Sequence, residues 1–172
     1  RDDILDQYEW QEGRHNRFDE IYGHILSPDE NRVVFSDNEG KQSKLRENGL
    51  WKLMDTEIYI GDAGTDIGTI QITDNTIFDG SPSWSPDGKK IVYTSGNSIL
   101  KNDYVTLHYL ESNKDEVIAR EPGASIRKPE YSSIGNLVYS ALYEGYDDLI
   151  VVSQGIHRIV IGSYPSQRQY VW

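Results

Sequence analysis

The sequence contains no cysteine and only one methionine. The lack of cysteine excludes disulfide bonds and thiolate metal sites. No apolar run approaches the roughly 18 residues of a transmembrane helix, so we expect no membrane insertion. Basic residues are also scarce, because 28 Asp and Glu stand against 17 Lys and Arg, for a formal net charge of −11. An acidic surface repels phosphate backbones, so we expect no nucleic-acid partner.

Tyrosine and tryptophan are abundant, with 12 Tyr and 4 Trp in 172 residues. These aromatic residues favour strands over helices. The chain also carries 15 glycines, which indicate frequent turns. A length of 172 residues is sufficient for a buried core. The composition therefore predicts an ordered, all-β protein.

A short phrase recurs along the chain. Residues 82–95 read PSWSPDGKKIVYTS, residues 24–36 read HILSPDENRVVFS, and residues 129–140 read PEYSSIGNLVYS. In each copy a bulky apolar residue ends a strand, a polar turn follows, and a β-branched and aromatic strand comes next. Proline fixes φ in the turn, Asp bonds back to the backbone, and Gly or Asn tolerates positive φ. Each copy predicts a β-hairpin.

A second hairpin follows each of these phrases. Its predicted strands cover residues 57–60 and 69–73 in the first unit, 104–109 and 116–118 in the second, and 148–152 and 157–161 in the third. Four antiparallel strands per unit form one blade of a β-propeller. Another compact β fold is the alternative.

The repeat divides the chain into segments. We expect blades over residues 20–74, 75–120 and 121–162, with a long loop insertion over 37–56 in the first. Residues 1–19 are an N-terminal segment, interpreted as a strand of a preceding blade, and residues 163–172 form the first strand of a further blade. Propellers usually have about 4–8 blades, so we expect these blades to belong to a larger ring. A further chain or copy would complete it.

The phrase at 82–93, together with the Ile-Tyr-Ile strand at 58–60, resembles the TolB-like propeller repeat. The resemblance is specific in the second unit, good in the first and weaker in the third. It implies a β-propeller fold. The same repeat occurs in periplasmic TolB proteins, in propellers of prolyl oligopeptidase-like enzymes and in oligogalacturonate lyases. The resemblance therefore indicates a fold better than a function.

The sequence contains no Gly-x-Ser-x-Gly nucleophile motif. Its histidines, which lack the short spacing of a metal site, are His15, His24, His108 and His157. We expect no catalytic residue in this chain, no metal and no cofactor. The resemblance leaves two alternatives open, an accessory propeller domain of a prolyl oligopeptidase-like hydrolase and a sugar-acid lyase. A lyase of this kind would gather histidines from several blades, and His24 is the candidate.

Ligand binding is expected where the longer loops lie. Because strands alternate in direction, the loops after the second and fourth strands share one face; they cover residues 37–56, 74–80, 95–102, 121–126, 142–147 and 163–167. Trp51 lies in a basic part of the first loop, and the starts of the innermost strands point into the central channel. The expected ligand-binding residues are His24, Trp51, Asp79, Arg127, Lys128 and Arg168. Converging cations suit carboxylate or phosphate ligands. Salt bridges to the acidic surface are the alternative.

These observations favour a non-catalytic binding or scaffolding module. Its expected partner is a protein or a small acidic ligand. The resemblance and the lack of cysteine point to a periplasmic or extracellular location, with the cytoplasm as the alternative.

Overall fold

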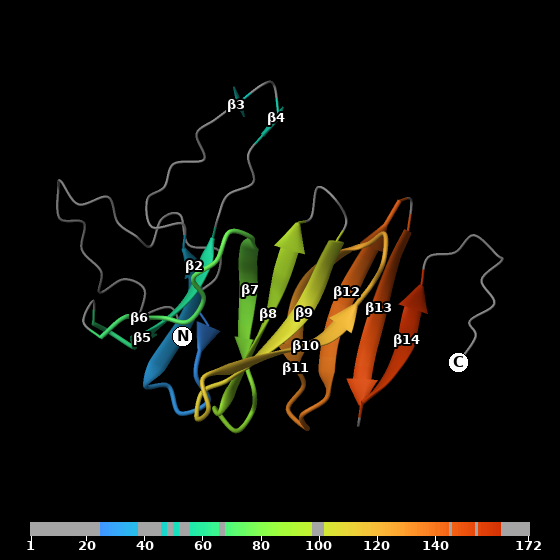
Figure 1. Cartoon of the computed structure of the whole chain (residues 1–172). Helices are drawn as coiled ribbons and strands as arrows, with labels where there is room; N and C mark the ends of the chain where they lie inside the picture. Colours follow the sequence, from blue (N-terminus) through green and yellow to red (C-terminus); the bar gives the residue numbers. More distant parts are fainter. Residues whose placement is uncertain are drawn as a thin grey trace.

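The computed structural model describes residues 25–37, 46–47, 50–51, 56–65, 68–97, 102–144, 146–153 and 155–162. Within these ranges the chain forms antiparallel strands and no helix. Three four-stranded sheets stand side by side in chain order, like the blades of an opened fan (Figure 1). This arrangement confirms the predicted fold class, a β-propeller of four-stranded antiparallel blades.

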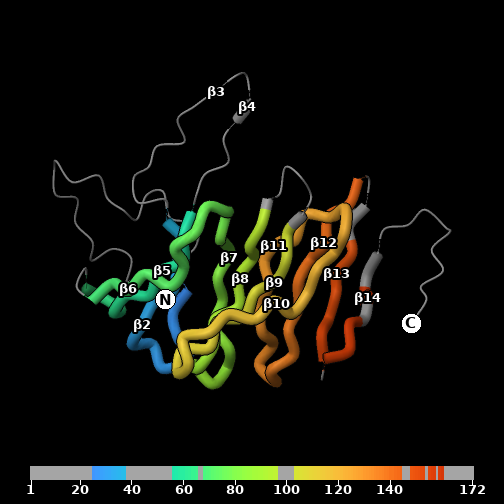
Figure 2. Tube along the Cα trace, in the orientation of Figure 1, coloured from blue at the N-terminus to red at the C-terminus, as the bar shows by residue number. Residues whose placement is uncertain are grey.

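Each blade is a meander that starts at an inner strand. Blade 1 consists of β1 (Ile25–Leu26), β2 (Arg32–Asp37), β5 (Glu57–Asp62) and β6 (Ile70–Gln71). Blade 2 consists of β7 (Phe78–Trp84), β8 (Lys90–Asn97), β9 (Asn102–Tyr109) and β10 (Lys114–Arg120). Blade 3 consists of β11 (Ser125–Tyr131), β12 (Leu137–Tyr143), β13 (Tyr146–Ser153) and β14 (Ile156–Gly162). The tube in Figure 2 follows the chain from blade 1 through blade 2 to blade 3.

The first blade departs from the sequence prediction in two places. The insertion, expected as a loop, contains a two-stranded ladder of β3 (Arg46–Glu47) and β4 (Leu50–Trp51). The fourth strand, expected over residues 69–73, pairs only through β6. Beyond β6 the Ile72 N–H still donates to the Ile58 carbonyl at 2.7 Å, and the Thr73 hydroxyl accepts the backbone N–H of Ile58 at 2.9 Å.

The turn between the first two strands of each blade depends on a serine. In blade 2 Ser85 Oγ donates to Asp87 Oδ1 at 2.6 Å and accepts the backbone N–H of Lys90 at 2.9 Å. Ser27 makes the corresponding two bonds in blade 1, at 2.5 and 3.0 Å. The hydrogen bond from Ser85 lowers the pKa of Asp87, because it favours the ionised carboxylate. The repeated phrase thus encodes a repeated turn.

The turn in blade 3 keeps the serine, lacks the aspartate and is one residue shorter. The backbone N–H of Asn136 donates to Ser132 Oγ at 3.0 Å, and the N–H of Gly135 donates to the Ser132 carbonyl at 2.9 Å. Ser132 directly follows Tyr131, just as Ser85 directly follows Trp84. Gly135 has a φ of 84°, which a side chain would disfavour.

The blades pack face to face through two apolar clusters. Blades 1 and 2 share one cluster, formed by Val34, Ile58, Ile60, Trp84, Ile91 and Tyr93. Blades 2 and 3 share another, which contains Val92, Val105, Leu107, Ile126, Leu137, Tyr139 and Ile150. Alternate residues of β8 point to opposite neighbours, as the two-residue period of a strand requires. Blade 2 is therefore apolar on both faces.

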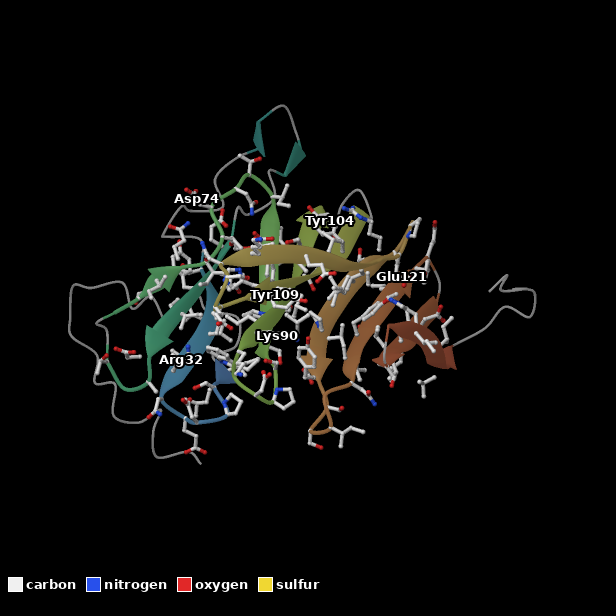
Figure 3. All side chains as sticks on the ribbon, turned by 60° about the horizontal axis from the view of Figure 1, so that its bottom comes forward. Arg32, Asp74, Lys90, Tyr104, Tyr109 and Glu121 are labelled. Atoms are coloured by element: carbon white, nitrogen blue, oxygen red, sulfur yellow. The ribbon has the colours of Figure 1, made fainter. Side chains whose placement is uncertain are left out.

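Trp84 also joins blades 1 and 2 through polar contacts. Its indole N–H donates to the Ile25 carbonyl at 2.9 Å, and the Arg32 guanidinium lies 4.8 Å from the ring centroid. Arg32 also donates to the Gly88 carbonyl at 3.3 Å. These contacts lie toward the short serine turns, where Figure 3 places Arg32 and Lys90.

The two ends of the fan differ. One end carries the short turns after the first and third strands of each blade, and we call it the turn end. The opposite end carries the connections after the second and fourth strands, and we call it the loop end; it is the upper end in Figure 1. Asp74 and Tyr104 lie toward the loop end in Figure 3.

Candidate functional site

The inner strands β7 and β11 begin at the loop end. Each pairs with one neighbour, β8 or β12, so its other edge carries no strand among the described residues. The buried prolines Pro82 and Pro129 mark equivalent positions on the two strands. Residues 79–81 of β7 therefore correspond to residues 126–128 of β11. We call the last two residues of each segment, Gly80 and Ser81 on β7 and Arg127 and Lys128 on β11, the mouth.

A β-bulge interrupts both strands at the mouth. The register of β7 against β8 shifts between Gly80 and Ser83, and that of β11 against β12 shifts between Arg127 and Glu130. The residues before the two prolines, Ser81 and Lys128, have positive φ values of 51° and 48°. Such a bulge bends the strand and re-aims its side chains. The repeat therefore includes a bulge in the first strand of blades 2 and 3.

Arg127 and Lys128 bring two adjacent positive charges to the mouth of an acidic chain. Both side chains are exposed, and neither forms an ion pair with another described residue. At the equivalent positions of β7 stand Gly80 and Ser81, which are small. The Phe78 ring covers Gly80 so closely that a Cβ there would lie 2.8 Å from Phe78 Cε1. The mouth thus has a cationic side and a small, partly aromatic side.

Asp79 lies behind the mouth, fully buried between blades 1 and 2. Its carboxylate accepts hydrogen bonds from the Ser95 hydroxyl and from Asn75 Nδ2, the latter at 2.6 Å. Burial raises the pKa of Asp79 above its usual value, although hydrogen bonds from Ser95, Asn75 and Thr73 favour the ionised form. Because Asp79 is enclosed by protein, it does not line the open mouth as the sequence predicted.

Asp103 is a second buried carboxylate, and sequence reasoning missed it. It lies at the start of β9 with 3% of its surface exposed, and its Oδ2 accepts the backbone N–H of Ile126 at 3.2 Å. Burial raises the pKa of Asp103 to about 6, against the opposing effects of the Ile126 hydrogen bond and the Arg127 charge. Its Oδ1 and the Thr94 hydroxyl are buried without a hydrogen-bond partner among the described residues.

These contacts repeat from one interface to the next. Thr56 Oγ1 donates to the Asp79 carbonyl at 2.8 Å, and the Asp79 N–H donates to the Thr56 carbonyl at 2.9 Å. Asp103 binds Ile126, and both pairs are separated by 23 residues. In each pair, the residue at or just before the start of a third strand holds the inner strand of the next blade. The sequence signal that could have revealed Asp103 is this spacing of 23 residues, which places Thr56 in blade 1 and Asp103 in blade 2 at equivalent positions.

Two histidines lie in hydrogen-bonded clusters away from the mouth. His108 is buried, and its Nδ1 lies 2.9 Å from Asp115 Oδ1, which also accepts the Tyr93 hydroxyl at 3.2 Å. His157 Nδ1 lies 3.2 Å from the Tyr139 hydroxyl, which donates to Glu121. Both arrangements satisfy polar groups of packed tyrosines.

The remaining predicted site residues are His24, Trp51, Arg127, Lys128 and Arg168. His24 and Arg168 lie outside the described residues, and the structure describes Trp51 only as part of β4. Arg127 and Lys128 lie at the start of an inner strand, where the sequence placed them, and their role in binding stays a prediction. No group of three His, Asp or Glu residues within the described ranges has the geometry to hold a metal ion. No helix of membrane-spanning length and apolarity occurs in the same ranges.

The fold has relatives among solved structures, although no family model and no curated protein sequence matches the chain. TolB from Acinetobacter baumannii aligns over 81% of this chain and 31% of its own, with a TM-score of 0.62 and 19% identity. An oligogalacturonate lyase in complex with manganese aligns over 83% of this chain and 42% of its own, with a TM-score of 0.62 and 12% identity. A puromycin-hydrolysing peptidase of Mycobacterium tuberculosis aligns over 85% of this chain and 23% of its own, with a TM-score of 0.57 and 16% identity.

The blade geometry and these similarities define the class of the protein, a β-propeller. The chain spans less than half the length of each of the three structures. Within that class, the fold is similar to that of TolB. The similar structures serve different activities by name, so they establish the fold alone.

Proposed function

We propose that this chain is a non-catalytic binding module that takes an acidic segment of a partner protein at the mouth. The observation that carries the proposal is the pair Arg127 and Lys128, exposed on an inner strand without an ion-pair partner among the described residues. In a chain of net charge −11, Arg127 and Lys128 place two adjacent positive charges on one exposed stretch of an inner strand. Arg and Lys bind carboxylates through charge-assisted hydrogen bonds.

The shape of the mouth supports an extended ligand. Gly80 and Ser81 occupy the positions that Arg127 and Lys128 occupy one blade further, so the facing strand carries no bulky side chain there. Gly80 is buried under the Phe78 ring, whereas Ser81 is small and partly exposed, so a peptide backbone can approach the strand at Ser81. The half-buried Phe78 ring beside Gly80 offers apolar contact for a ligand side chain. An acidic peptide can thus contact both inner strands.

Direct titration tests this proposal. An acetylated hexa-aspartate peptide is titrated into the chain at low salt by calorimetry, and a hexa-asparagine peptide serves as the neutral probe. We expect R127A/K128A to weaken hexa-aspartate binding by at least about tenfold, because charge-assisted hydrogen bonds contribute about 1.5–3 kcal/mol each. The matched control K89A/K114A removes two exposed lysines at the turn end and should bind like the unchanged chain.

Three results would overturn the proposal: no binding of hexa-aspartate, equal binding of hexa-asparagine, or an equal loss in the two double variants. Trigalacturonate forms a separate arm, because the oligogalacturonate lyase among the similar structures acts, by its name, on a carboxylated sugar. Tighter binding of trigalacturonate than of hexa-aspartate would replace the protein partner by a sugar acid.

The remaining alternatives also stay predictions. A lyase activity predicts cleavage of trigalacturonate in the presence of manganese. Attachment to a hydrolase predicts a catalytic domain elsewhere in the same protein. A periplasmic or extracellular location is tested by cell fractionation.

A further inference from the structure

The interface between blades 2 and 3 directly behind the mouth contains a polar region. Thr94 pairs with Val105, and Gly96 pairs with Asp103. Val105 belongs to the apolar cluster shared with blade 3, so Thr94 and Asp103 point to blade 3 as well. Gly96, directly opposite Asp103, contributes no side chain. Asp103 and Thr94 therefore share a buried surface that faces β11.

This buried surface leaves the Asp103 carboxylate incompletely compensated. Oδ2 accepts one N–H, from Ile126, while Oδ1 and the Thr94 hydroxyl have no partner among the described residues. An ionised carboxylate without full hydrogen bonding is costly to bury. A protonated carboxyl carries no charge, so it costs less to bury with a single hydrogen bond than the ionised carboxylate does. The geometry favours proton binding at this position.

The charged groups around Asp103 are few. Arg127 follows Ile126 on β11. Among the described residues, its positive charge is the one that acts on Asp103, and it lowers the pKa of that carboxyl. Tyr104, the next residue on β9, is neutral, and the Arg120 guanidinium lies 4.5 Å from the centroid of its ring. Thr94 and Gly96 on β8 are uncharged. Arg127 therefore belongs to the mouth and also favours the ionised form of Asp103.

We propose that the mouth binds its anionic ligand together with one proton, and that Asp103 holds the proton. This inference rests on the proposed function, because it requires a carboxylate to bind Arg127. A bound carboxylate neutralises the field that Arg127 exerts on Asp103. Asp103 then loses the charge that favours its ionised form and takes up a proton from solvent. Binding tightens as the pH falls.

The titration lies in an accessible range, because burial already raises the pKa of Asp103 to about 6. If the ligand raises this pKa by about one unit, the affinity for hexa-aspartate should be up to about tenfold higher at pH 5.5 than at pH 8. Calorimetry at pH 6.5 in two buffers of different ionisation enthalpy should show uptake of about half a proton per ligand. The aspartate side chains of the peptide, with a pKa of about 3.9, remain largely ionised in this range.

The variant D103N separates this inference from the proposed function. We expect D103N to bind hexa-aspartate with an affinity that is flat between pH 5.5 and 8 and without proton uptake. The control E111Q changes an exposed turn carboxylate and should keep the pH dependence. Wild-type binding that does not vary with pH would overturn the inference alone, as would pH dependence that persists in D103N. A chain that binds no hexa-aspartate at any pH would overturn the proposed function itself.

Discussion

Replacement of Asp103 by Asn should stabilise the protein at neutral pH and do so much less at acidic pH. The pKa of Asp103 rises from the usual 3.8 to about 6 in the folded chain. A group whose folded pKa lies above its unfolded value stabilises the fold under acidic conditions, and this contribution is lost as the pH rises through the folded pKa. A rise of about two units corresponds to at most about 3 kcal/mol between pH 4 and pH 7. D103N removes this titration.

Urea unfolding followed by tryptophan fluorescence measures the effect. At pH 8 we expect the free energy of unfolding of D103N to exceed that of the unchanged chain by about 1–3 kcal/mol, with about a third of that difference at pH 4.5. Asn keeps an acceptor for the Ile126 N–H, whereas Ala does not, so D103A should be destabilised at both pH values. A D103N chain that is destabilised equally at both pH values would refute the reasoning about its charge.

Two further predictions concern packing and are checked by the same urea assay. W84F should lower the free energy of unfolding by about 1–3 kcal/mol, because the Ile25 carbonyl loses the indole N–H donor. The control Y131F, at the equivalent position of blade 3, should lower it by less than about 1 kcal/mol. Equal losses in the two variants would count against the indole hydrogen bond as the cause. G80A should cost about 1–3 kcal/mol through its clash with the Phe78 ring, and F78A/G80A should cost less than the two single changes combined; strict additivity would show that this contact is unimportant.

The blades could be predicted because their turns are encoded locally. Ser85, Asp87 and Gly88 determine a turn by bonds within six residues, and the flanking strands alternate in the usual way. The third unit was harder, because its turn replaces the aspartate and is one residue shorter. Its serine at 132 performs the same task, and that role becomes visible only through the hydrogen bonds.

The mouth could be predicted only in part. Alignment of the repeats placed Arg127 and Lys128 at the start of an inner strand, but nothing in the sequence indicated the bulge, which depends on how the strand fits between its neighbours. The same alignment placed Asp79 at the mouth, whereas its side chain turns into the interface with blade 1. The face on which a side chain lies changes with a single residue of register.

Asp103 escaped prediction because its chemistry comes from packing. In the sequence, Asp103 is one of 28 acidic residues, and nothing but its place near the start of a predicted strand sets it apart. Its burial, its bond to Ile126 and its proximity to Arg127 appear only when blade 3 packs on blade 2. Contacts between consecutive blades are long-range contacts, and strand patterns describe single blades.

The most direct test of the central claim is to map where an acidic ligand binds. Amide chemical shifts of the isotope-labelled chain are followed while acetylated hexa-aspartate is added at low salt. If the ligand binds at the mouth, the largest changes in chemical shift should occur at Gly80, Ser81, Arg127 and Lys128, and added salt should reverse them. Changes concentrated at the serine turns of residues 27–31, 85–89 and 132–136, or spread evenly over both ends of the fan, would contradict it.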